Sequence, residues 1–296
     1  MDIKKYAAID IGSNAIRLLV ANVISKDNFP TQYRKSSLVR VPIRLGADAF
    51  TTGIISKNNI NRITDAMQAF KLLMSVHGVE KFKACATSAM REASNGKMII
   101  ETVLKKTGIK IDVIDGKTEA AIISATDLNE IILGDDPYLY VDVGGGSTEF
   151  TFFDKGKMVT SRSFKLGTVR HVDKKTNKVI LDKLEEWITD ISKDFKGISL
   201  IGSGGNINKI FKMSGQPLGR PLSYVYMKAN YEFLKKMSYE DRITELGLNP
   251  DRADVILPAS KIYLRAMKWS RADKIYVPKI GLSDGIIKGL HLGTLK

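Results

Sequence analysis

The sequence is organised around one stretch, Tyr140-Val141-Asp142-Val143-Gly144-Gly145-Gly146-Ser147-Thr148-Glu149. Its apolar residues flank a single carboxylate, as in a buried β-strand that turns Asp142 toward the opposite face. The three glycines carry no Cβ, so their backbone can adopt positive φ and bring its N–H groups close to an anion. We therefore predict a phosphate-binding loop at Gly144, Gly145 and Gly146, with hydroxyl donors from Ser147 and Thr148.

Two carboxylates, Asp142 and Glu149, bracket this loop. Carboxylate oxygens are ligands that Mg²⁺ prefers, and phosphoryl chemistry needs such a metal beside phosphate donors. Residues 150–161 are typical of strand, tight turn and strand, whereas a P-loop runs directly into a helix. The loop is therefore predicted to be the turn of a hairpin. A glycine-rich hairpin without a chemical role is the alternative interpretation.

The same pattern occurs a second time, because residues 6–21 resemble residues 138–153. Each copy has an apolar strand, a central aspartate, a turn with glycine and a hydroxyl, and a second strand. Asp10 matches Asp142, and Gly12-Ser13-Asn14 matches the glycine loop. Two copies of one unit predict two similarly folded halves that hold a phosphate from both sides. Chance similarity between two aspartate-containing hairpins is the alternative.

We place the domain boundary at the middle of the chain, giving residues 1–125 and 126–296, with the last helix able to pack back on the first domain. Apolar periodicity predicts helices over residues 60–77, 120–128 and 180–196, among short strands. Alternating helices and strands indicate the α/β fold class.

Three further positions are candidates for chemistry. Arg91 follows the end of a predicted strand, where its guanidinium could bind phosphate or pair with a surface carboxylate such as Glu92. Glu119 lies at the start of a predicted helix, where it either complements the helix dipole or acts as a general base. Gly204 and Gly205 lie in a small-residue turn before a helix, which is a natural anion site.

The composition favours a polyanionic ligand. The formal net charge is +14, and the basic excess is spread over both halves: residues 1–125 carry 19 basic and 11 acidic side chains, and residues 126–296 carry 27 and 21. Such a field attracts polyanions, although a basic surface without a specific ligand is the alternative. Aromatic residues fall on core stripes, so we expect no nucleic acid as a partner.

Cysteine and hydropathy patterns bear on the compartment. Cys85 is the single cysteine, which excludes an internal disulfide framework and a multi-cysteine zinc site. The first residues resemble no signal peptide, and no apolar run reaches the roughly 18 residues of a membrane span. We therefore expect a cytoplasmic protein with no membrane partner.

Several motifs in order carry a family resemblance: Ala8-Ile9-Asp10-Ile11-Gly12-Ser13-Asn14 with Arg17, Ala86-Thr87-Ser88-Ala89-Met90-Arg91, Gly116-Lys117-Thr118-Glu119-Ala120, Asp142 to Glu149, Leu166-Gly167-Thr168-Val169-Arg170 and Gly202-Ser203-Gly204-Gly205. With them the chain resembles the exopolyphosphatase and guanosine pentaphosphate phosphohydrolase family, of the actin/Hsp70/sugar-kinase superfamily. The resemblance implies two ribonuclease-H-like α/β domains with an interdomain cleft. It also implies a Mg²⁺-dependent hydrolase, with other divalent cations possible, and a homodimer.

The resemblance assigns roles to the candidate residues. Glu119 matches the glutamate that activates water, with Arg91 beside it at the catalytic centre, so the resemblance favours the base over the dipole interpretation. The metal ligands implied are Asp142, Glu149 and Asp10. Phosphate would be held by the following residues: Ser13, Asn14, Arg17, Gly144, Gly145, Gly146, Ser147, Thr148, Gly204 and Gly205.

The sequence departs from the family pattern in places. Larger members carry an additional helical C-terminal region that this sequence lacks, so we expect a preference for short or medium polyphosphates. Ala259, Ile287 and Lys288 replace a usual glycine, arginine and glutamate, which should alter the cleft wall or the domain interface. The predicted substrate is inorganic polyphosphate. The alternatives are guanosine pentaphosphate hydrolysis, a non-catalytic polyphosphate- or nucleotide-binding protein, and a sugar or acetate kinase.

Overall fold

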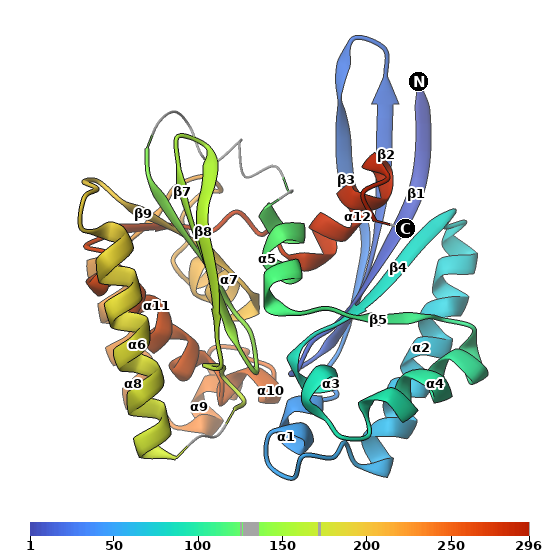
Figure 1. Ribbon diagram of the computed structural model, residues 1–296, viewed down its shortest axis with the longest axis horizontal. Coiled ribbons are helices and arrows are strands. Elements are labelled where there is room, and N and C mark those ends of the chain that lie inside the picture. The colour runs from blue at the N-terminus through green and yellow to red at the C-terminus, as the bar shows by residue number, and fades with distance from the viewer. Residues whose placement is uncertain (125, 127–135, 171–172, 296) are drawn as a thin grey trace. The chain divides into compact units, whose positions relative to one another are not determined.

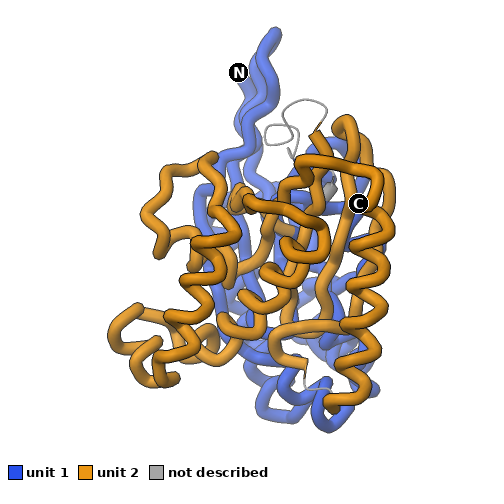
Figure 2. Tube along the Cα trace, turned by 90° about the vertical axis from the view of Figure 1, so that its left-hand side faces the viewer, with its two compact units in different colours: residues 1–126, 282–296 blue, residues 127–281 orange. Residues whose placement is uncertain are grey.

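The computed structural model describes residues 1–124, 126, 136–170 and 173–295. Contacts group the chain into two units: unit 1 comprises residues 1–126 and 282–296, and unit 2 comprises residues 127–281 (Figure 2). The last segment thus belongs with the N-terminal residues, and unit 2 is inserted within unit 1. None of the helices in the described ranges is long and apolar enough to cross a membrane.

Unit 1 contains a five-stranded sheet with the order β3-β2-β1-β4-β5 (Figure 1). Its strands are β1 (Asp2–Ile11), β2 (Ile16–Lys26), β3 (Phe29–Val41), β4 (Lys81–Ala86) and β5 (Ile111–Val113). The first three form an antiparallel meander, and β1, β4 and β5 are parallel neighbours. The parallel strands place the ends of β1, β4 and β5 at one edge of the sheet, where the predicted site residues of this half follow.

Helices cover both faces of this sheet. They are α1 (Leu45–Ala49), α2 (Lys57–His77), α3 (Ser88–Glu92), α4 (Gly96–Thr107), α5 (Gly116–Ser124) and α12 (Leu282–Leu292). Ile9 and Ile11 share a core with Ile63 and Phe70 of α2 on one face. The helix predicted over residues 120–128 begins earlier, at Gly116; residues 125, 127 and 128 lie outside the described residues.

The other face of the unit 1 sheet is covered by α12, which contacts β1, β2, β4 and α5. The centroids of the His291 ring and of the Tyr6 ring on β1 are 6.5 Å apart. Gly285 allows the close approach of α12 to α5, because a Cβ at this position would lie 2.2 Å from the carbonyl oxygen of Ile122. The apolar side of the last helix therefore completes the core of unit 1.

Unit 2 contains a six-stranded sheet with the order β10-β11-β9-β6-β7-β8. Its strands are β6 (Tyr138–Val143), β7 (Thr148–Asp154), β8 (Lys157–Phe164), β9 (Ser199–Ser203), β10 (Leu222–Ser223) and β11 (Lys274–Tyr276). The run β8-β7-β6-β9-β11 has the same directions as β3-β2-β1-β4-β5. The predicted repeat is confirmed, and each sheet has the strand order and directions of a ribonuclease-H-like domain.

The turn between β7 and β8 confirms the predicted strand, turn and strand. Lys155 and Gly156 form it with φ values of 49° and 71°, which suit a tight hairpin turn. The helices of unit 2 are α6 (Lys174–Ser192), α7 (Gly205–Met213), α8 (Tyr224–Lys236), α9 (Tyr239–Thr244), α10 (Pro250–Ala253) and α11 (Ile256–Trp269). Tyr263 and Met267 of α11 are fully buried in the same core as Phe150 of β7.

Candidate functional site

The hairpin of β6 and β7 places two carboxylates face to face in unit 2. Asp142 pairs directly with Glu149 across the two strands, so both side chains lie on the same face of the sheet. Glu149 is only 2% exposed, and its Oε1 accepts hydrogen bonds from Ser147 Oγ at 2.7 Å and Ser163 Oγ at 2.9 Å. Like charges directly opposite each other repel, so a cation bound between them would stabilise this pair.

The loop that joins these strands presents backbone donors. The Gly144 N–H donates to the Ser147 carbonyl at 3.0 Å and closes the turn. Val169 N–H and Arg170 Nε donate to the carbonyls of Gly145 and Gly146, at 2.8 Å and 2.6 Å respectively. Within the described ranges, the N–H groups of Gly145, Gly146 and Ser147 donate to no protein atom. Three neighbouring amides therefore remain for an anion.

The three glycines of this loop do not use the positive φ that the sequence interpretation invoked, so that part of the interpretation is wrong. None of these three described glycines has positive φ. A Cβ on Gly167 would lie 2.2 Å from the Gly145 carbonyl oxygen. The loop of residues 166–170 therefore packs directly on the backbone of residues 144–148, the loop between β6 and β7 that we call the clamp. The hydroxyls also have other partners, since Ser147 donates to Glu149 and Thr148 donates to the Leu166 carbonyl at 2.5 Å.

A second turn of unit 2 lies beside Asp142. Gly204, between β9 and α7, has φ of 113°, and a Cβ there would lie 3.5 Å from Asp142 Oδ1. The Tyr263 hydroxyl donates to the Ser203 carbonyl just before this turn. Complete burial, followed by the charge of Asp142, raises the pKa of Tyr263 well above its usual value. Sequence reasoning missed Tyr263, because it occurs among the apolar residues of a helix.

Unit 1 repeats the hairpin with one charge reversed. Asp10 pairs across β1 and β2 with Arg17, and Arg17 Nη1 lies 2.7 Å from Asp10 Oδ2. The Gly12 N–H donates to the Ala15 carbonyl at 3.2 Å, which closes the turn as Gly144 does in unit 2. The position of Glu149 in one hairpin is therefore occupied by a built-in cation in the other.

The other predicted phosphate ligands of unit 1 lie at this turn. Ser13 is buried, and its Oγ lies 3.0 Å from the Oγ of Ser88 at the start of α3. The Ser13 and Asn14 carbonyls accept hydrogen bonds from Gly46 and Arg44, at 2.8 Å and 3.0 Å respectively. As in unit 2, a neighbouring loop fixes the carbonyls of the turn.

Arg91 and Glu119 also belong to unit 1. Arg91 Nη1 donates to the Ile114 carbonyl at 2.6 Å, and no carboxylate of the described residues lies within salt-bridge distance of it. Glu119 lies in the first turn of α5, whose N-terminal end is capped by Asp115 Oδ1, an acceptor for the Thr118 N–H at 2.7 Å. That hydrogen bond lowers the pKa of Asp115. Capping is therefore already provided by a residue other than Glu119.

The buried thiol of Cys85 lies beside Asp10 in unit 1. Burial is the main cause that raises its pKa to about 12; Lys83 opposes the rise, while Asp112, Asp10 and Glu119 add to it. Cys85 is the direct neighbour of Asp10 across β1 and β4. Asp10 and Glu119 both belong to unit 1, and both charges add to the rise in the pKa of this thiol.

The predicted metal ligands are divided between the units. Asp142 and Glu149 belong to unit 2, whereas Asp10 belongs to unit 1 and forms a salt bridge with Arg17. Among the residues that the structure describes, no group of three or more His, Cys, Asp and Glu side chains forms a metal-binding cluster. The predicted cleft and the joint metal site remain predictions.

The departures from the family pattern have a structural context. Ile287 is 2% exposed on α12 and Ala259 is 0% exposed on α11, so both are core residues of their own units. Lys288 is half-buried next to Ile287. Isoleucine at position 287, where the family usually has arginine, therefore extends the apolar side of α12.

Two sheets with the same strand order and directions, each containing an aspartate in a hairpin of its central strands, define a two-domain protein of the ribonuclease-H-like class. Residues 37–293 match the Ppx/GppA phosphatase family, which covers most of the chain. The chain belongs to this family.

Named relatives agree with that membership. The chain is 30% identical to exopolyphosphatase 2 of Mycobacterium tuberculosis, over 98% of this chain and 99% of the relative. It is 27% identical to a bifunctional 3-dehydroquinate synthase/phosphatase of Fusobacterium nucleatum. That alignment includes 96% of this chain but only 46% of the relative's length, so the chain spans about half of this relative. The crystal structure of an exopolyphosphatase from Cytophaga hutchinsonii has a TM-score of 0.87 at 23% identity, covering 99% of both chains, and so shares the fold.

Proposed function

We propose that the protein is a Mg²⁺-dependent exopolyphosphatase that removes the terminal phosphate of inorganic polyphosphate. The observation that carries the proposal is the unit 2 hairpin, where the opposed Asp142 and Glu149 flank the free amides of Gly145, Gly146 and Ser147. A cation would relieve the repulsion between the opposed carboxylates, and the loop amides can donate hydrogen bonds to an anion. A divalent cation beside the end of a phosphate chain would satisfy both sets of groups.

The residues of the hairpin fit a divalent cation. The donors that face each other are the oxygens of two carboxylates, which is the ligand chemistry that Mg²⁺ prefers. Asp142 and Glu149 would hold Mg²⁺, or another divalent cation, and we assign Asp10 as a third ligand. When bound, the cation neutralises charge on the transferring phosphoryl group. Asp10 also holds Arg17 in place through its salt bridge.

The side chains of the chain itself supply the remaining functions. The loop amides bind the terminal phosphate, and Arg17 and Arg91 neutralise its oxygens. Glu119 accepts a proton from water as the water oxygen attacks phosphorus in line. The bond between phosphorus and the bridging oxygen breaks, giving inorganic phosphate and a polyphosphate shorter by one unit. Water is the only co-reactant.

A phosphate-release assay tests this proposal. Polyphosphates of graded length, with guanosine pentaphosphate in parallel, are incubated with and without Mg²⁺. Glu119→Gln should lower kcat about 10²–10⁴-fold, as loss of a general base does. Glu101→Gln, an exposed carboxylate on α4, is the matched control and should keep the wild-type rate. A Glu119→Gln enzyme with normal kcat would exclude this residue as the base.

The alternatives separate in the same assay. Preference for guanosine pentaphosphate, which the same residues would hydrolyse, would reassign the substrate. Binding without turnover would indicate a non-catalytic polyphosphate- or nucleotide-binding protein. We also propose a cytoplasmic homodimer, to be tested by fluorescence localisation and by sedimentation of the full chain. A monomer at working concentration would remove the dimer from the proposal.

A further inference from the structure

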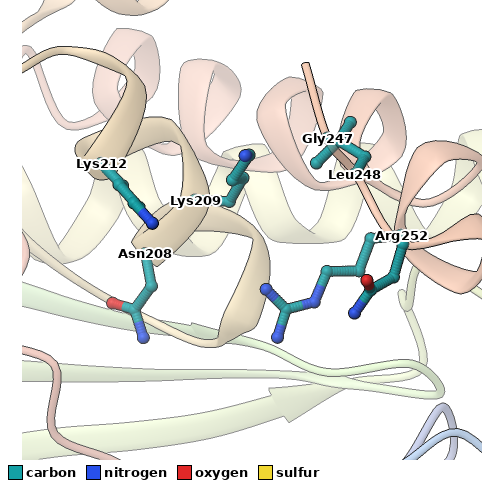
Figure 3. A pocket seen from close by; sticks show the side chains of 7 residues that line it. Asn208, Lys209, Lys212, Gly247, Leu248 and Arg252 are labelled. Carbon is teal, nitrogen blue, oxygen red and sulfur yellow. The ribbon is translucent and has the colours of Figure 1, made fainter. Parts of the chain in front are cut away.

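A basic cavity lies on unit 2, and its lining residues lie outside the hairpin of β6 and β7. Its volume is about 330 Å³, and Asn208, Lys209 and Lys212 of α7 line it together with Arg252 of α10 (Figure 3). The lining residues include three cationic side chains and, among the residues that the structure describes, no carboxylate. A cavity with this charge pattern suits an anion.

The two lysines have no carboxylate partner. Lys209 Nζ donates to the Leu246 carbonyl at 2.8 Å, and neither lysine lies within salt-bridge distance of a described acidic side chain. Burial first, and then the charges of Lys212 and Arg252, lower the pKa of Lys209. The cations therefore repel one another here, and a bound anion would relieve that repulsion.

Asn208 adds an adaptable neutral group. It lines the cavity, and its Oδ1 is buried without a hydrogen-bond partner in the described part of the chain. An amide can turn either its carbonyl or its NH₂ group toward a ligand. Figure 3 shows the guanidinium of Arg252 extending toward the helix that carries Asn208. Charged and neutral groups from two helices thus surround one space.

Helix α7 connects this cavity to the clamp. The helix begins at Gly205, directly after Gly204 beside Asp142, and Asn208 N–H donates back to the Gly204 carbonyl at 3.3 Å. Asn208 and Lys212 follow Gly204 by one to two helical turns, which corresponds to about 6–12 Å along the axis. A polyanion whose end is held at the clamp would need only a few linked phosphates to reach Lys209.

We propose that Lys209, Lys212 and Arg252 form a subsite for the phosphates of polyphosphate that remain after the terminal one is removed. The proposal rests on the proposed function, because it takes the clamp as the place where the terminal phosphate binds. This subsite gives longer chains an additional anchor, whereas pyrophosphate is too short to engage both positions.

The experiment compares Lys209→Met, Lys212→Met and the double variant with Lys178→Met, which removes an exposed lysine of α6 in the same unit. Binding of pyrophosphate, tripolyphosphate and a longer linear polyphosphate is measured calorimetrically with Mg²⁺ present, and every protein compared carries Glu119→Gln so that turnover is slow during the measurement. Each single variant should weaken binding of the longer chain about tenfold, the loss expected for one charge-assisted contact. Pyrophosphate affinity should change less than about twofold, within the range of weak surface electrostatics.

The results separate the two proposals. Wild-type protein that neither binds nor hydrolyses polyphosphate would reject the proposed function. Wild-type binding and turnover, with pocket variants equal to Lys178→Met on the longer chain, would overturn the subsite alone. Equal weakening for pyrophosphate and the longer chain would also overturn it, since it would mean an independent anion site. Lys212 is exposed, so Lys212→Met keeps the test valid if Lys209→Met does not fold.

Discussion

Replacing Gly167 by alanine should distort the clamp from outside it. The new Cβ would lie 2.2 Å from the Gly145 carbonyl oxygen, 2.5 Å from the Gly145 carbonyl carbon and 2.6 Å from that of Gly146. All three atoms are backbone, so no flexible side chain can turn away. The φ of Gly167 is not positive, and the effect of the substitution is therefore steric.

The size of the effect follows from these distances. Restoring normal contact requires the two loops to separate by about 1 Å, and a misplacement of that size in a catalytic site can reduce rate about 100-fold. The hydrogen bonds from Val169 and Arg170 to Gly145 would also lengthen from 2.8 Å and 3.1 Å. Overpacking of this kind costs about 1–3 kcal/mol in the free energy of unfolding.

Phosphate release and urea unfolding are measured on the same preparations, with Gly197→Ala as the control. Gly197 has φ of 69° and open space around it, so alanine there strains only the backbone, by about 1–2 kcal/mol. The control should lose comparable stability and keep its kcat at a permissive temperature. Gly167→Ala with wild-type kcat would refute the assignment of the loop as the phosphate clamp.

Three further predictions concern stability and pH. Tyr263→Phe leaves the Ser203 carbonyl without its donor, so the free energy of unfolding should fall by about 1–2 kcal/mol. The variant should also need a higher Mg²⁺ concentration for activity. An unchanged Mg²⁺ requirement would show that Tyr263 does not act on Asp142. Arg242→Met removes the donors to the Leu234, Met237 and Ala253 carbonyls and should lower the free energy of unfolding by about 3 kcal/mol. The control Arg220→Met changes an exposed arginine and should lower it little. Equal urea midpoints for the two variants would contradict this prediction. Because the pKa of Cys85 rises from 9.0 to about 12 on folding, its contribution to stability is complete below pH 9.0 and is lost as the pH rises toward about 12. In a plot of the free energy of unfolding against pH, Cys85→Ala should flatten this region. Parallel plots for the variant and the wild type would exclude the thiol as the cause of the loss.

Local pattern was sufficient to predict the two hairpins. Asp142 and Asp10 each occur in an apolar run before a turn, and period-2 alternation alone places them on one face of a strand. The hydrogen-bond partners of the loop hydroxyls were harder to predict. Ser147 and Thr148 resemble phosphate donors in the sequence, but in the structure they donate to Glu149 and to the Leu166 carbonyl. Those acceptors depend on strand register and on a distant loop.

Tertiary packing explains what the sequence could not reveal. Tyr263 is one apolar-looking position of a helix, and only the packing of α11 brings its hydroxyl to Ser203. Lys209 and Arg252 are far apart along the chain and lie on different helices, so no spacing rule joins them. The close contact of Gly167 with Gly145 likewise appears only when two loops meet.

The packing of α12 in unit 1 has a consequence for the order in which the two units can fold. Domains generally fold as units while the chain is made, with the N-terminal one first. Here the earliest-made sheet lacks the helix that covers one of its faces until residues 282–292 have been synthesised. All of unit 2 precedes residues 282–292 in the chain, so we expect unit 2 to be able to fold before the core of unit 1 is complete.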